Sequence, residues 1–398
     1  MASNKQQQNP PKRKVGLIQT FGRQPMPALI GSVAFAPDSV VLVHEKGSAQ
    51  VGHAVNAMQL RSVKQFEVDP DERIMGQTRE AVRDAIRNWL QQGHDVIVNA
   101  TGGSAAMIMG AALGATDMFE EAESGCVSVV ALELTATDTD GIPQLRSLFP
   151  GENTRDLEAS AKQNLENLSV ELVAKAHGQT VGNGNQPSEA LRAFARACLQ
   201  SPQAEAELWT CLKTRPKLSG KLSEVNANLW LKPFQLNGSL QSAAIDGGLL
   251  QTCEGGVCIS RPADGNADQK RGGIARNAKL LTGAWVELAL FQYAVKQQFR
   301  DIQWSTDERG ANTEHDLLAL KGATLVVGSA KRSIQGQRIY AHLHELRAQA
   351  NRLGGRKSIA LLAIANLCGG DREVHELKRV AALVGVQIIG PDELRAAF

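Results

Sequence analysis

The feature that most constrains the fold of this chain is an apolar run that ends in two glycines and leads directly into an apolar helix. The run His94–Asn99 has the length and composition of a buried strand, and the turn 101–104 (Thr-Gly-Gly-Ser) precedes a helix that starts at Ala105. Strand–turn–helix units of this kind build parallel sheets that are covered by helices on both faces. Ligands of such sheets bind at the carboxyl ends of the strands, in the loops that lead to the helices.

The same alternation runs through the first 148 residues. Residues 73–90 carry apolar side chains at helical spacing, and residues 50–60 also read as a helix. Four further segments are expected to be strands: Val15–Phe21, Val40–His44, Val63–Val68 and Val127–Leu134. The pattern therefore predicts a parallel α/β domain over residues 14–148. A polar tail over residues 1–13 precedes it, and we expect this tail to be disordered.

The rest of the chain changes character twice. Residues 149–238 contain two polar helical stretches, near Arg155–His177 and Ser188–Leu212, and are predicted to form a helical connector. From residue 239 onward the chain is α/β again, but of a different kind. The elements expected there are a Gly-rich β segment over Ser239–Arg261, a helix from about Thr282, a hairpin of Asp316–Leu320 with Thr324–Gly328, a helix over Gln337–Leu353, and strands over Lys357–Ile364 and Val386–Ile389.

Length and composition limit the class of protein. A chain of 398 residues is too long for one ordinary hydrophobic core, so two or three domains are expected. The net charge of +2 neither requires nor excludes nucleic acid, because binding needs only a local basic patch. Six scattered cysteines are typical of reduced thiols in a cytosolic protein. With no signal peptide and no apolar run long enough to span a bilayer, we expect a cytoplasmic protein without a membrane partner.

Two segments of the first domain are candidate ligand contacts. The turn 101–104 can present backbone N–H groups, a hydroxyl and the positive end of a helix to a phosphate. The other reading is a tight turn in which Ser104 caps the helix. Gln19, Thr20 and Gln24 follow the first strand, and they either contact a base or ribose or form a polar turn fixed by two prolines. NAD binding is not expected, because the glycines do not follow the G-x-G-x-x-G pattern.

Three acids and one lysine in the last part of the chain have the order of a metal-dependent phosphodiesterase site. Glu287 lies on a predicted helix, and Glu314 and Asp316 lie at the start of a predicted strand. Lys331 follows the hairpin partner of that strand. Carboxylates hold the divalent cation that generates hydroxide, and a nearby lysine orients water or offsets phosphate charge. Acids at strand ends are also common without any metal, so the spacing alone leaves both readings open.

Five motifs occur in a specific order along the chain. They are Val98–Ser104 (Val-Asn-Ala-Thr-Gly-Gly-Ser), Gly283–Glu287 (Gly-Ala-Trp-Val-Glu), Thr313–Leu317 (Thr-Glu-His-Asp-Leu), Ser329–Lys331 (Ser-Ala-Lys) and Leu353–Gly355 (Leu-Gly-Gly). In this order they resemble the motifs of CRISPR-associated Rossmann-fold (CARF) effector nucleases of type III CRISPR systems, whose nuclease domain is restriction-endonuclease-like, of the PD-(D/E)xK type. The resemblance covers roughly residues 14–140 and 240–395 and leaves the helical middle uncovered.

The resemblance implies an α/β fold with a Rossmann-like (CARF) domain over residues 14–148, a helical connector, and a restriction-endonuclease-like α/β domain over residues 239–398. It also implies a homodimer that binds a two-fold-symmetric cyclic oligoadenylate, commonly cyclic tetra-adenylate, and then cleaves DNA, RNA or both with Mn²⁺ or Mg²⁺. The implied ligand contacts are Gln19, Thr20, Gln24, Asn99, Thr101, Gly102, Gly103 and Ser104. The implied metal ligands are Glu287, Glu314 and Asp316, and the implied catalytic residues are Glu314, Asp316, Ser329 and Lys331.

One position departs from the family pattern and keeps other functions open. Ser329 stands where the family has a glutamate two residues before the lysine. A hydroxyl is a poorer ligand for a hard divalent cation than a carboxylate. One alternative is therefore an oligoadenylate sensor whose degenerate nuclease fold only binds nucleic acid. Another is a phosphodiesterase that degrades the cyclic ligand within the sensor domain.

Overall fold

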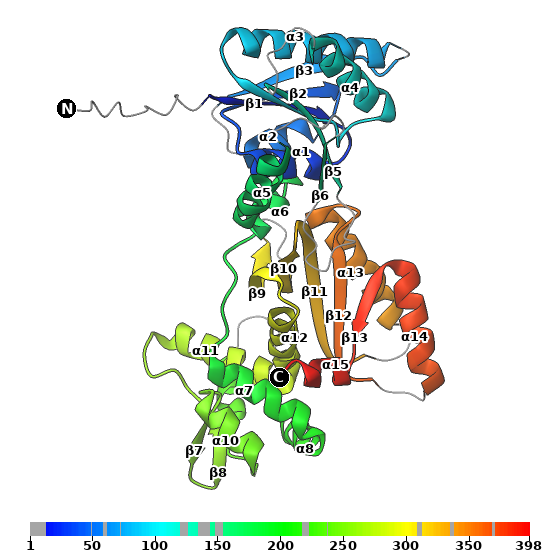
Figure 1. Ribbon diagram of the computed structural model, residues 1–398. Helices are drawn as coiled ribbons and strands as arrows, with labels where there is room; N and C mark the ends of the chain where they lie inside the picture. The colour runs from blue at the N-terminus through cyan, green and yellow to red at the C-terminus, as the bar shows by residue number, and fades with distance from the viewer. Residues whose placement is uncertain are drawn as a thin grey trace, which may run out of the picture. The chain divides into compact units, whose positions relative to one another are not determined.

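A computed structural model gives the fold of the chain as two compact units, Met1–Thr180 and Val181–Phe398 (Figure 1). The residues that the structure describes are 13–48, 50–58, 62–71, 73–119, 126–133, 144–147, 154–216, 223–236, 238–308, 313–334, 338–367 and 371–398. The predicted polar tail over residues 1–13 therefore lies outside the described residues except for its last residue. Within the described ranges, no helix has both the length and the apolar composition needed to cross a membrane.

The first unit is built on a six-stranded sheet with the order β3-β2-β1-β4-β5-β6. The strands β1 to β5 are parallel, and β6 is antiparallel to β5. The order 3-2-1-4-5 is that of Rossmann-like sheets, so the predicted fold class of this domain is confirmed. The strands span Val15–Phe21 (β1), Ser39–Glu45 (β2), Val63–Val68 (β3), Asp95–Asn99 (β4), Val127–Glu133 (β5) and Gln144–Ser147 (β6).

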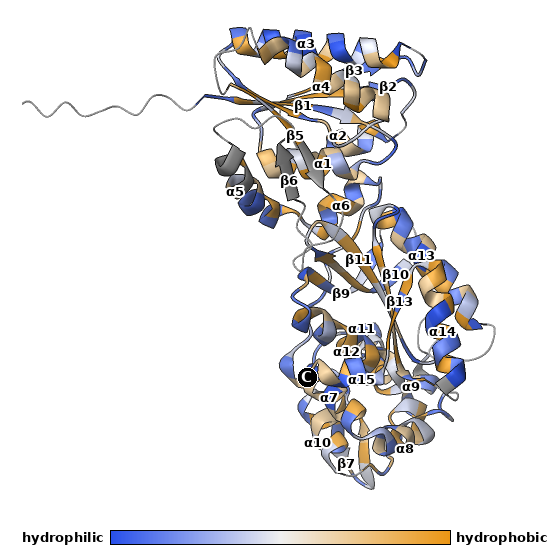
Figure 2. Cartoon of the chain, turned by 45° about the vertical axis from the view of Figure 1, so that its right-hand side comes forward, coloured by the Kyte–Doolittle hydropathy of each residue, from blue (hydrophilic) through white to orange (hydrophobic). Residues whose placement is uncertain are grey.

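Helices cover both faces of this sheet (Figure 1). On one face, α3 (Ile74–Gln91) packs closely against α4 (Ala105–Phe119). The close packing depends on Gly110, because a Cβ atom there would lie 2.4 Å from the backbone oxygen of Met75. In Figure 2, α3 alternates between hydrophilic and hydrophobic residues, as expected for a helix with one face on the sheet. The other face carries α1 (Met26–Phe35), α2 (Val51–Met58), α5 (Thr154–Asn164), η1 (Leu165–Asn167) and α6 (Val170–Ala176).

Helix α1 was not predicted, since its segment reads as a Gly/Pro-rich loop. Pro27 lies in the first turn of this helix, where a missing N–H costs nothing. Eight of the ten residues of α1 are buried, so the helix has no polar face whose spacing would reveal it in the sequence. The helix matters for the candidate ligand site because it begins immediately after the loop that follows β1.

The helical stretches predicted within residues 149–238 are present, but they do not form one connector. The helices α5 and α6 belong to the first unit, where they pack on α1 and α2. In contrast, α7 (Glu189–Gln200) belongs to the second unit and packs on α10 and α12. The division follows burial, because the apolar face of each helix is covered by its own unit. Further helices here are α8 (Pro202–Leu212) and α9 (Glu224–Trp230).

The second unit is built on a five-stranded mixed sheet with the order β13-β12-β11-β10-β9. The strands β9 (Arg300–Glu308), β10 (Thr313–Lys321) and β11 (Thr324–Ser333) are antiparallel, whereas β12 (Ile359–Asn366) and β13 (Val386–Ile389) are parallel to β11. Gly322 adopts a φ of +59° between Lys321 and Thr324, which confirms the predicted hairpin turn. The strand β9 was not predicted.

Helices also flank this second sheet. The helix α12 (Trp285–Lys296) contacts strands β9 to β12, and α13 (Arg338–Gly354) contacts β11 to β13. The remaining helices are α10 (Ser239–Asp246), α11 (Ala267–Lys279), a π segment (Leu280–Ala284), α14 (Asp371–Val384) and α15 (Pro391–Ala396). The prediction of a β segment over Ser239–Arg261 was wrong in its first half, because Leu240 and Ala244 are buried at helical spacing in α10. The second half is the hairpin of β7 (Leu250–Cys253) and β8 (Gly256–Ile259).

Candidate functional site

A pocket opens at the carboxyl end of the parallel sheet in the first unit. Its volume is about 630 Å³, and it lies where the loops after β1, β2 and β4 meet. This is the edge at which parallel α/β sheets bind ligands. The lining residues are Phe21, Gly22, Arg23, Glu45, Lys46, Gly47, Ser48, Gln50, Gly103 and Ser104.

The glycines of the turn 101–104 allow two loops to pack without side chains between them. A Cβ atom on Gly102 would lie 2.5 Å from the backbone oxygen of Thr20, and Gly103 adopts a φ of +93°. The loops approach so closely that a Cβ atom on Gly22 would lie 3.0 Å from Gly103. The wall of the pocket is therefore bare backbone at this point, as anion binding by N–H groups requires.

The side chains of Gln19, Thr20 and Asn99 fix the position of this turn through hydrogen bonds. All three are buried. Asn99 Nδ2 donates to Gln19 Oε1 at 2.8 Å, and Gln19 Nε2 donates to the Ala28 oxygen at 3.1 Å and to Ser32 Oγ at 2.9 Å. The hydroxyl of Thr20 donates to the Gly102 oxygen. Because these polar groups form their hydrogen bonds within the first unit, the three residues act by positioning the turn 101–104.

The other predicted ligand contacts differ in their placement. Ser104 lines the pocket and also accepts a hydrogen bond from the Met107 N–H at 3.4 Å, so the capping role and pocket placement occur together. The hydroxyl of Thr101 donates to Asn99 Oδ1. Gln24 is half-buried and is not one of the described residues that line the pocket.

Sequence reasoning missed two cationic residues at the pocket. Arg23 and Lys46 are exposed, and both line it directly after the ends of β1 and β2. Each is the first or second residue beyond a strand end, which was a usable signal, because loops after parallel strands share one edge of a sheet. Two positive side chains beside bare backbone N–H groups suit a ligand with phosphate groups.

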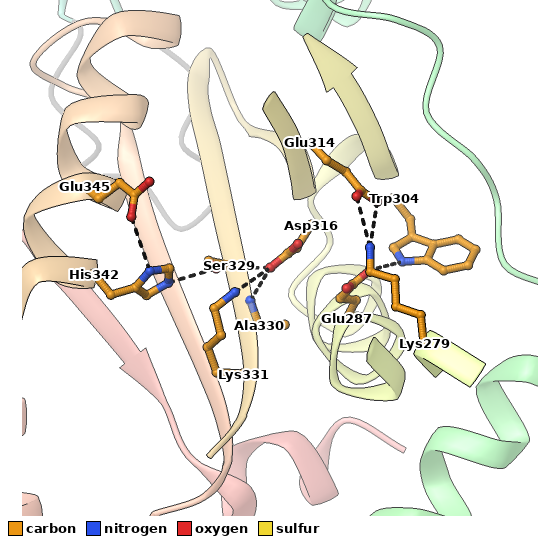
Figure 3. A network of polar contacts seen from close by, with 10 residues as sticks. All are labelled: Lys279, Glu287, Trp304, Glu314, Asp316, Ser329, Ala330, Lys331, His342 and Glu345. Atoms are coloured by element: carbon orange, nitrogen blue, oxygen red, sulfur yellow. Dashed lines mark hydrogen bonds and ion pairs between the residues drawn. The ribbon is translucent and has the colours of Figure 1, made fainter. Parts of the chain in front are cut away.

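In the second unit, the hairpin of β10 and β11 brings Asp316 and Lys331 together. The Lys331 ammonium lies 3.6 Å from Asp316 Oδ2 (Figure 3). The same carboxylate oxygen accepts hydrogen bonds from the Ala330 N–H at 2.7 Å and from Ser329 Oγ at 3.0 Å. Three of the predicted catalytic residues, Asp316, Ser329 and Lys331, are therefore neighbours on two adjacent strands.

Glu287 projects from α12 toward the same region and is buried, with 6% of its surface exposed. Its Oε2 atom accepts a hydrogen bond from Trp304 Nε1 at 3.1 Å. Burial, and after it the nearby charge of Asp316, together raise the pKa of Glu287 to about 7. Two carboxyl groups whose charges repel each other in a partly buried place form a site that a cation stabilises.

Glu314 is paired differently from the other two acids. Lys279 Nζ lies 3.0 Å and 3.2 Å from its two carboxylate oxygens, and Ser305 Oγ donates to it at 2.5 Å. Burial opposes ionisation, but the hydrogen bonds from Ser305 and Lys279 outweigh it and lower the pKa of Glu314. Burial likewise lowers the pKa of Lys279, but attraction to Glu287 and Glu314 raises it overall. The carboxylate of Glu314 therefore already has a cationic partner.

A histidine that sequence reasoning missed completes the site. His342 Nε2 on α13 lies 3.1 Å from Ser329 Oγ, and its Nδ1 atom lies 3.7 Å from a carboxylate oxygen of Glu345. The hydroxyl of Ser329 thus bridges the Asp316 carboxylate and an imidazole ring (Figure 3). Burial and the charge of Lys331 lower the pKa of His342. No spacing in the sequence relates His342 to Ser329, because the contact depends on how α13 returns across β11.

The residues present fit a hard divalent cation only in part. Among the residues that the structure describes, no three His, Cys, Asp or Glu side chains converge closely enough to hold one metal ion. Among the charged groups that act on Glu287, Asp316 has the largest effect. Mg²⁺ is commonly held by one or two carboxylates, with water and substrate phosphate as its other ligands. These two carboxylates therefore suit such a cation, and Glu314 does not join them directly.

No protein-family model matches this chain, and no curated protein matches it. Solved structures do. The Can2 protein of Sulfobacillus thermosulfidooxidans, in complex with cyclic tetra-adenylate, has a TM-score of 0.61 at 15% identity, with 96% of this chain and 95% of that chain covered. Protein VC1899 of Vibrio cholerae has a TM-score of 0.67 at 14% identity, with 96% of each chain covered.

A third similar structure is a type III CRISPR defence DNA nuclease activated by cyclic oligoadenylate. Its TM-score is 0.54 at 15% identity, and the match covers 93% of this chain but 48% of that one. This chain thus spans about half the length of that nuclease. At identities this low the likeness concerns the fold alone, and it shows that the chain shares the fold of the matched parts of these proteins.

Proposed function

We propose that the chain is a metal-dependent endonuclease of type III CRISPR defence that a cyclic oligoadenylate activates. In this proposal, the first unit is a CARF sensor and the second is a nuclease of the PD-(D/E)xK type. The observation that carries the proposal is the grouping of Asp316 and Lys331 on one hairpin, 3.6 Å apart, with the buried Glu287 electrostatically coupled to Asp316. The fold that the chain shares with two oligoadenylate-associated proteins supports it.

In the sensor, the pocket suits the phosphate groups of a ring. Backbone N–H groups around Gly103 would contact phosphate oxygens, and Arg23 and Lys46 would offset their charge. Gln19 and Asn99 would act indirectly, by fixing the turn. We propose cyclic tetra-adenylate as the ligand and a cytoplasmic homodimer as the active form, because two pockets related by a two-fold axis match a two-fold-symmetric ring.

In the nuclease unit, each residue near Asp316 has a distinct role. A cation bound there would supply a water molecule of lowered pKa and would neutralise charge on the phosphate. Asp316 and Glu287 would hold this cation, and Lys331 would orient the attacking water or contact the phosphate. Ser329 and His342 position the Asp316 carboxylate by way of the hydroxyl bridge. The proposed substrate is DNA, RNA or both.

A second candidate function is that of an oligoadenylate-controlled protein that binds nucleic acid without cutting it. The observation in its favour is the donor set, in which a hydroxyl occupies position 329 and the Glu314 carboxylate is paired with Lys279. Such a protein would retain both binding activities in every divalent metal and release no cleaved product.

The test is incubation of the full chain with cyclic tri-, tetra- or hexa-adenylate, Mn²⁺, and plasmid, single-stranded DNA or RNA. We expect cutting that requires both a ring and the metal. Asp316→Asn and Lys331→Ala should abolish cutting but leave ring binding intact, as measured by calorimetry. Cutting that persists in both variants would show that the site is wrongly assigned. Analysis of the ring itself after the reaction separates a ring-degrading enzyme from a sensor.

A further inference from the structure

Lys279 ends helix α11 and places its ammonium group among the carboxylates of the candidate active site. Figure 3 shows this group facing Glu314, with which it forms two hydrogen bonds. The carboxylates whose charges act on Lys279 are Glu287, Glu314 and Asp316. These are the three acids that the sequence assigns to a metal ion. Besides Lys331, which is paired with Asp316, Lys279 therefore also acts on the negative charge that a divalent cation would neutralise.

The backbone beside Lys279 is interrupted. The π segment Leu280–Ala284 follows it directly, and Gly283 adopts a φ of +152° within that segment. Helix α11 carries Lys279 on one side of this kink, and α12 carries Glu287 on the other. π segments are rare and occur often at functional sites, because they set side chains at angles that a regular helix does not allow.

We infer that Lys279 is a tethered cation, which neutralises the carboxylate site in the metal-free protein and competes with a divalent cation for it. The inference rests on the proposed nuclease site and adds a residue to it. Without Lys279, Glu287, Glu314 and Asp316 would repel one another in a partly buried place. With Lys279 in place, an incoming Mn²⁺ ion meets a positive charge close to its ligands, and like charges at such distances repel strongly.

The pairing also assigns a role to Glu314. A divalent cation held by Glu287 and Asp316 would repel the ammonium group and displace it. The hydrogen bonds of 3.0 Å and 3.2 Å to Glu314 give the ammonium group a partner that it would keep during this movement. Glu314 is then an anchor for Lys279, and its position outside the Glu287–Asp316 pair follows from that role. Side-chain rotation of a half-exposed lysine suffices for this movement.

The experiment is a calorimetric titration of the full-length protein with Mn²⁺, in the absence of any ring or nucleic acid. Lys279→Met removes the charge and keeps the length of the side chain, so we expect Mn²⁺ to bind at least about tenfold more tightly than to the wild type. Lys279→Arg retains the charge and should bind Mn²⁺ as weakly as the wild type. Lys270→Met removes the same charge from the same helix, away from the carboxylates, and should change little.

A second readout guards against a variant that folds poorly. Since a ligand of the folded state raises Tm, Mn²⁺ should raise the Tm of Lys279→Met more than that of the wild type. Equal or weaker Mn²⁺ affinity in Lys279→Met overturns the inference, and so does an equal gain in Lys270→Met. If the wild type cuts nucleic acid with Mn²⁺ but Lys279→Met shows no gain, only the role of Lys279 fails. If no variant binds Mn²⁺, this inference and the metal-dependent nuclease fail together.

Discussion

At the scale of single residues, the carboxyl group of Glu287 carries a measurable signature of the candidate active site. Its pKa is raised to about 7 by burial and by the charge of Asp316, against an ordinary value of 4.5. Between these two values the folded protein holds a proton that the unfolded chain has released. The free energy of unfolding therefore falls as pH rises from about 4.5 through 7, by about 3 kcal/mol in total.

We predict that Glu287→Gln removes this pH dependence, because glutamine does not titrate. The measurement is urea unfolding of metal-free protein at several pH values, with tryptophan fluorescence as the signal. Four of the five tryptophans lie in the second unit, so the signal reports mainly on the relevant unit. The wild type should lose more stability than the variant between pH 5 and pH 8. Parallel curves for the two proteins would contradict a raised pKa at this position.

The turn at the sensor pocket yields a second prediction, for Gly102→Ala. The added methyl group would meet the Thr20 oxygen at 2.5 Å, so the loops must separate at a cost of about 1 to 3 kcal/mol. We expect cyclic tetra-adenylate to bind at least about tenfold more weakly, as measured by calorimetry. Gly52→Ala on α2 is the matched control, because a Cβ atom there meets nothing within 4 Å. If Gly102→Ala bound the ring with wild-type affinity, the turn would not contribute to ligand binding.

Only part of the candidate sites could be predicted from single residues in the sequence. The turn 101–104 and the pair of Asp316 and Lys331 were found because glycines after a strand, and charges on a hairpin, are local patterns. Lys46 and His342 were missed, because their places depend on which loops and helices meet in space. The sequence also placed Gln19 at the ligand, whereas its amide is consumed inside the unit by α1 and Asn99.

At the scale of elements, the kink between α11 and α12 determines how Lys279 and Glu287 face each other. Gly283 requires its lack of a side chain, because a φ of +152° is strained for any other residue. We predict that Gly283→Ala lowers the free energy of unfolding by about 1 to 3 kcal/mol. Gly272→Ala in the regular part of α11 should instead raise it by up to about 1 kcal/mol. Urea unfolding measures the free energy of unfolding of both variants. An unchanged free energy in Gly283→Ala would mean that the kink does not require glycine at this position.

The elements that could be predicted are those with a clear local pattern. Apolar runs predicted strands β1, β2, β4 and β5 and the hairpin of β10 and β11, and these strands and the predicted β3 are all present. The helix α1 was missed because it is buried nearly all round, and α10 was mistaken for a strand because its apolar residues are few. The strand β9 was missed because only part of it is apolar and buried, as expected for the edge strand of a sheet.

At the scale of the whole molecule, the sequence did not predict where the chain divides. The boundary after Thr180 falls inside the expected connector, since burial of each helix rather than its polarity decides the unit to which it belongs.

The proposed homodimer requires a surface at which two copies of the chain meet. Adjacent helices α3 and α4 expose three large apolar side chains, namely Met75, Met109 and Leu113. An exposed apolar patch of this kind is typical of an interaction surface, and a second copy of the chain is the partner we propose.

In the proposed homodimer, Met109→Glu would place a charge in the apolar surface of α3 and α4, so we predict that it weakens dimerisation. Met109 is 58% exposed, so the variant should fold normally. Sedimentation velocity should show a larger fraction of monomer than in the wild type, and ring-dependent cutting should fall with it. Leu383→Glu, at a residue of the second unit that is 74% exposed, is the control and should remain dimeric. If Met109→Glu stayed dimeric, the dimer interface would have to lie on another surface of the chain.

The central claim is that a ring bound in the first unit controls cation-dependent hydrolysis in the second. The initial rate of nucleic-acid cleavage, measured with Mn²⁺ in the presence and absence of cyclic tetra-adenylate, tests it most directly. We predict a rate that rises many-fold with the ring, stays at background in EDTA, and is lost in Asp316→Asn. A rate that is the same with and without every ring tested, or that survives EDTA, would contradict it.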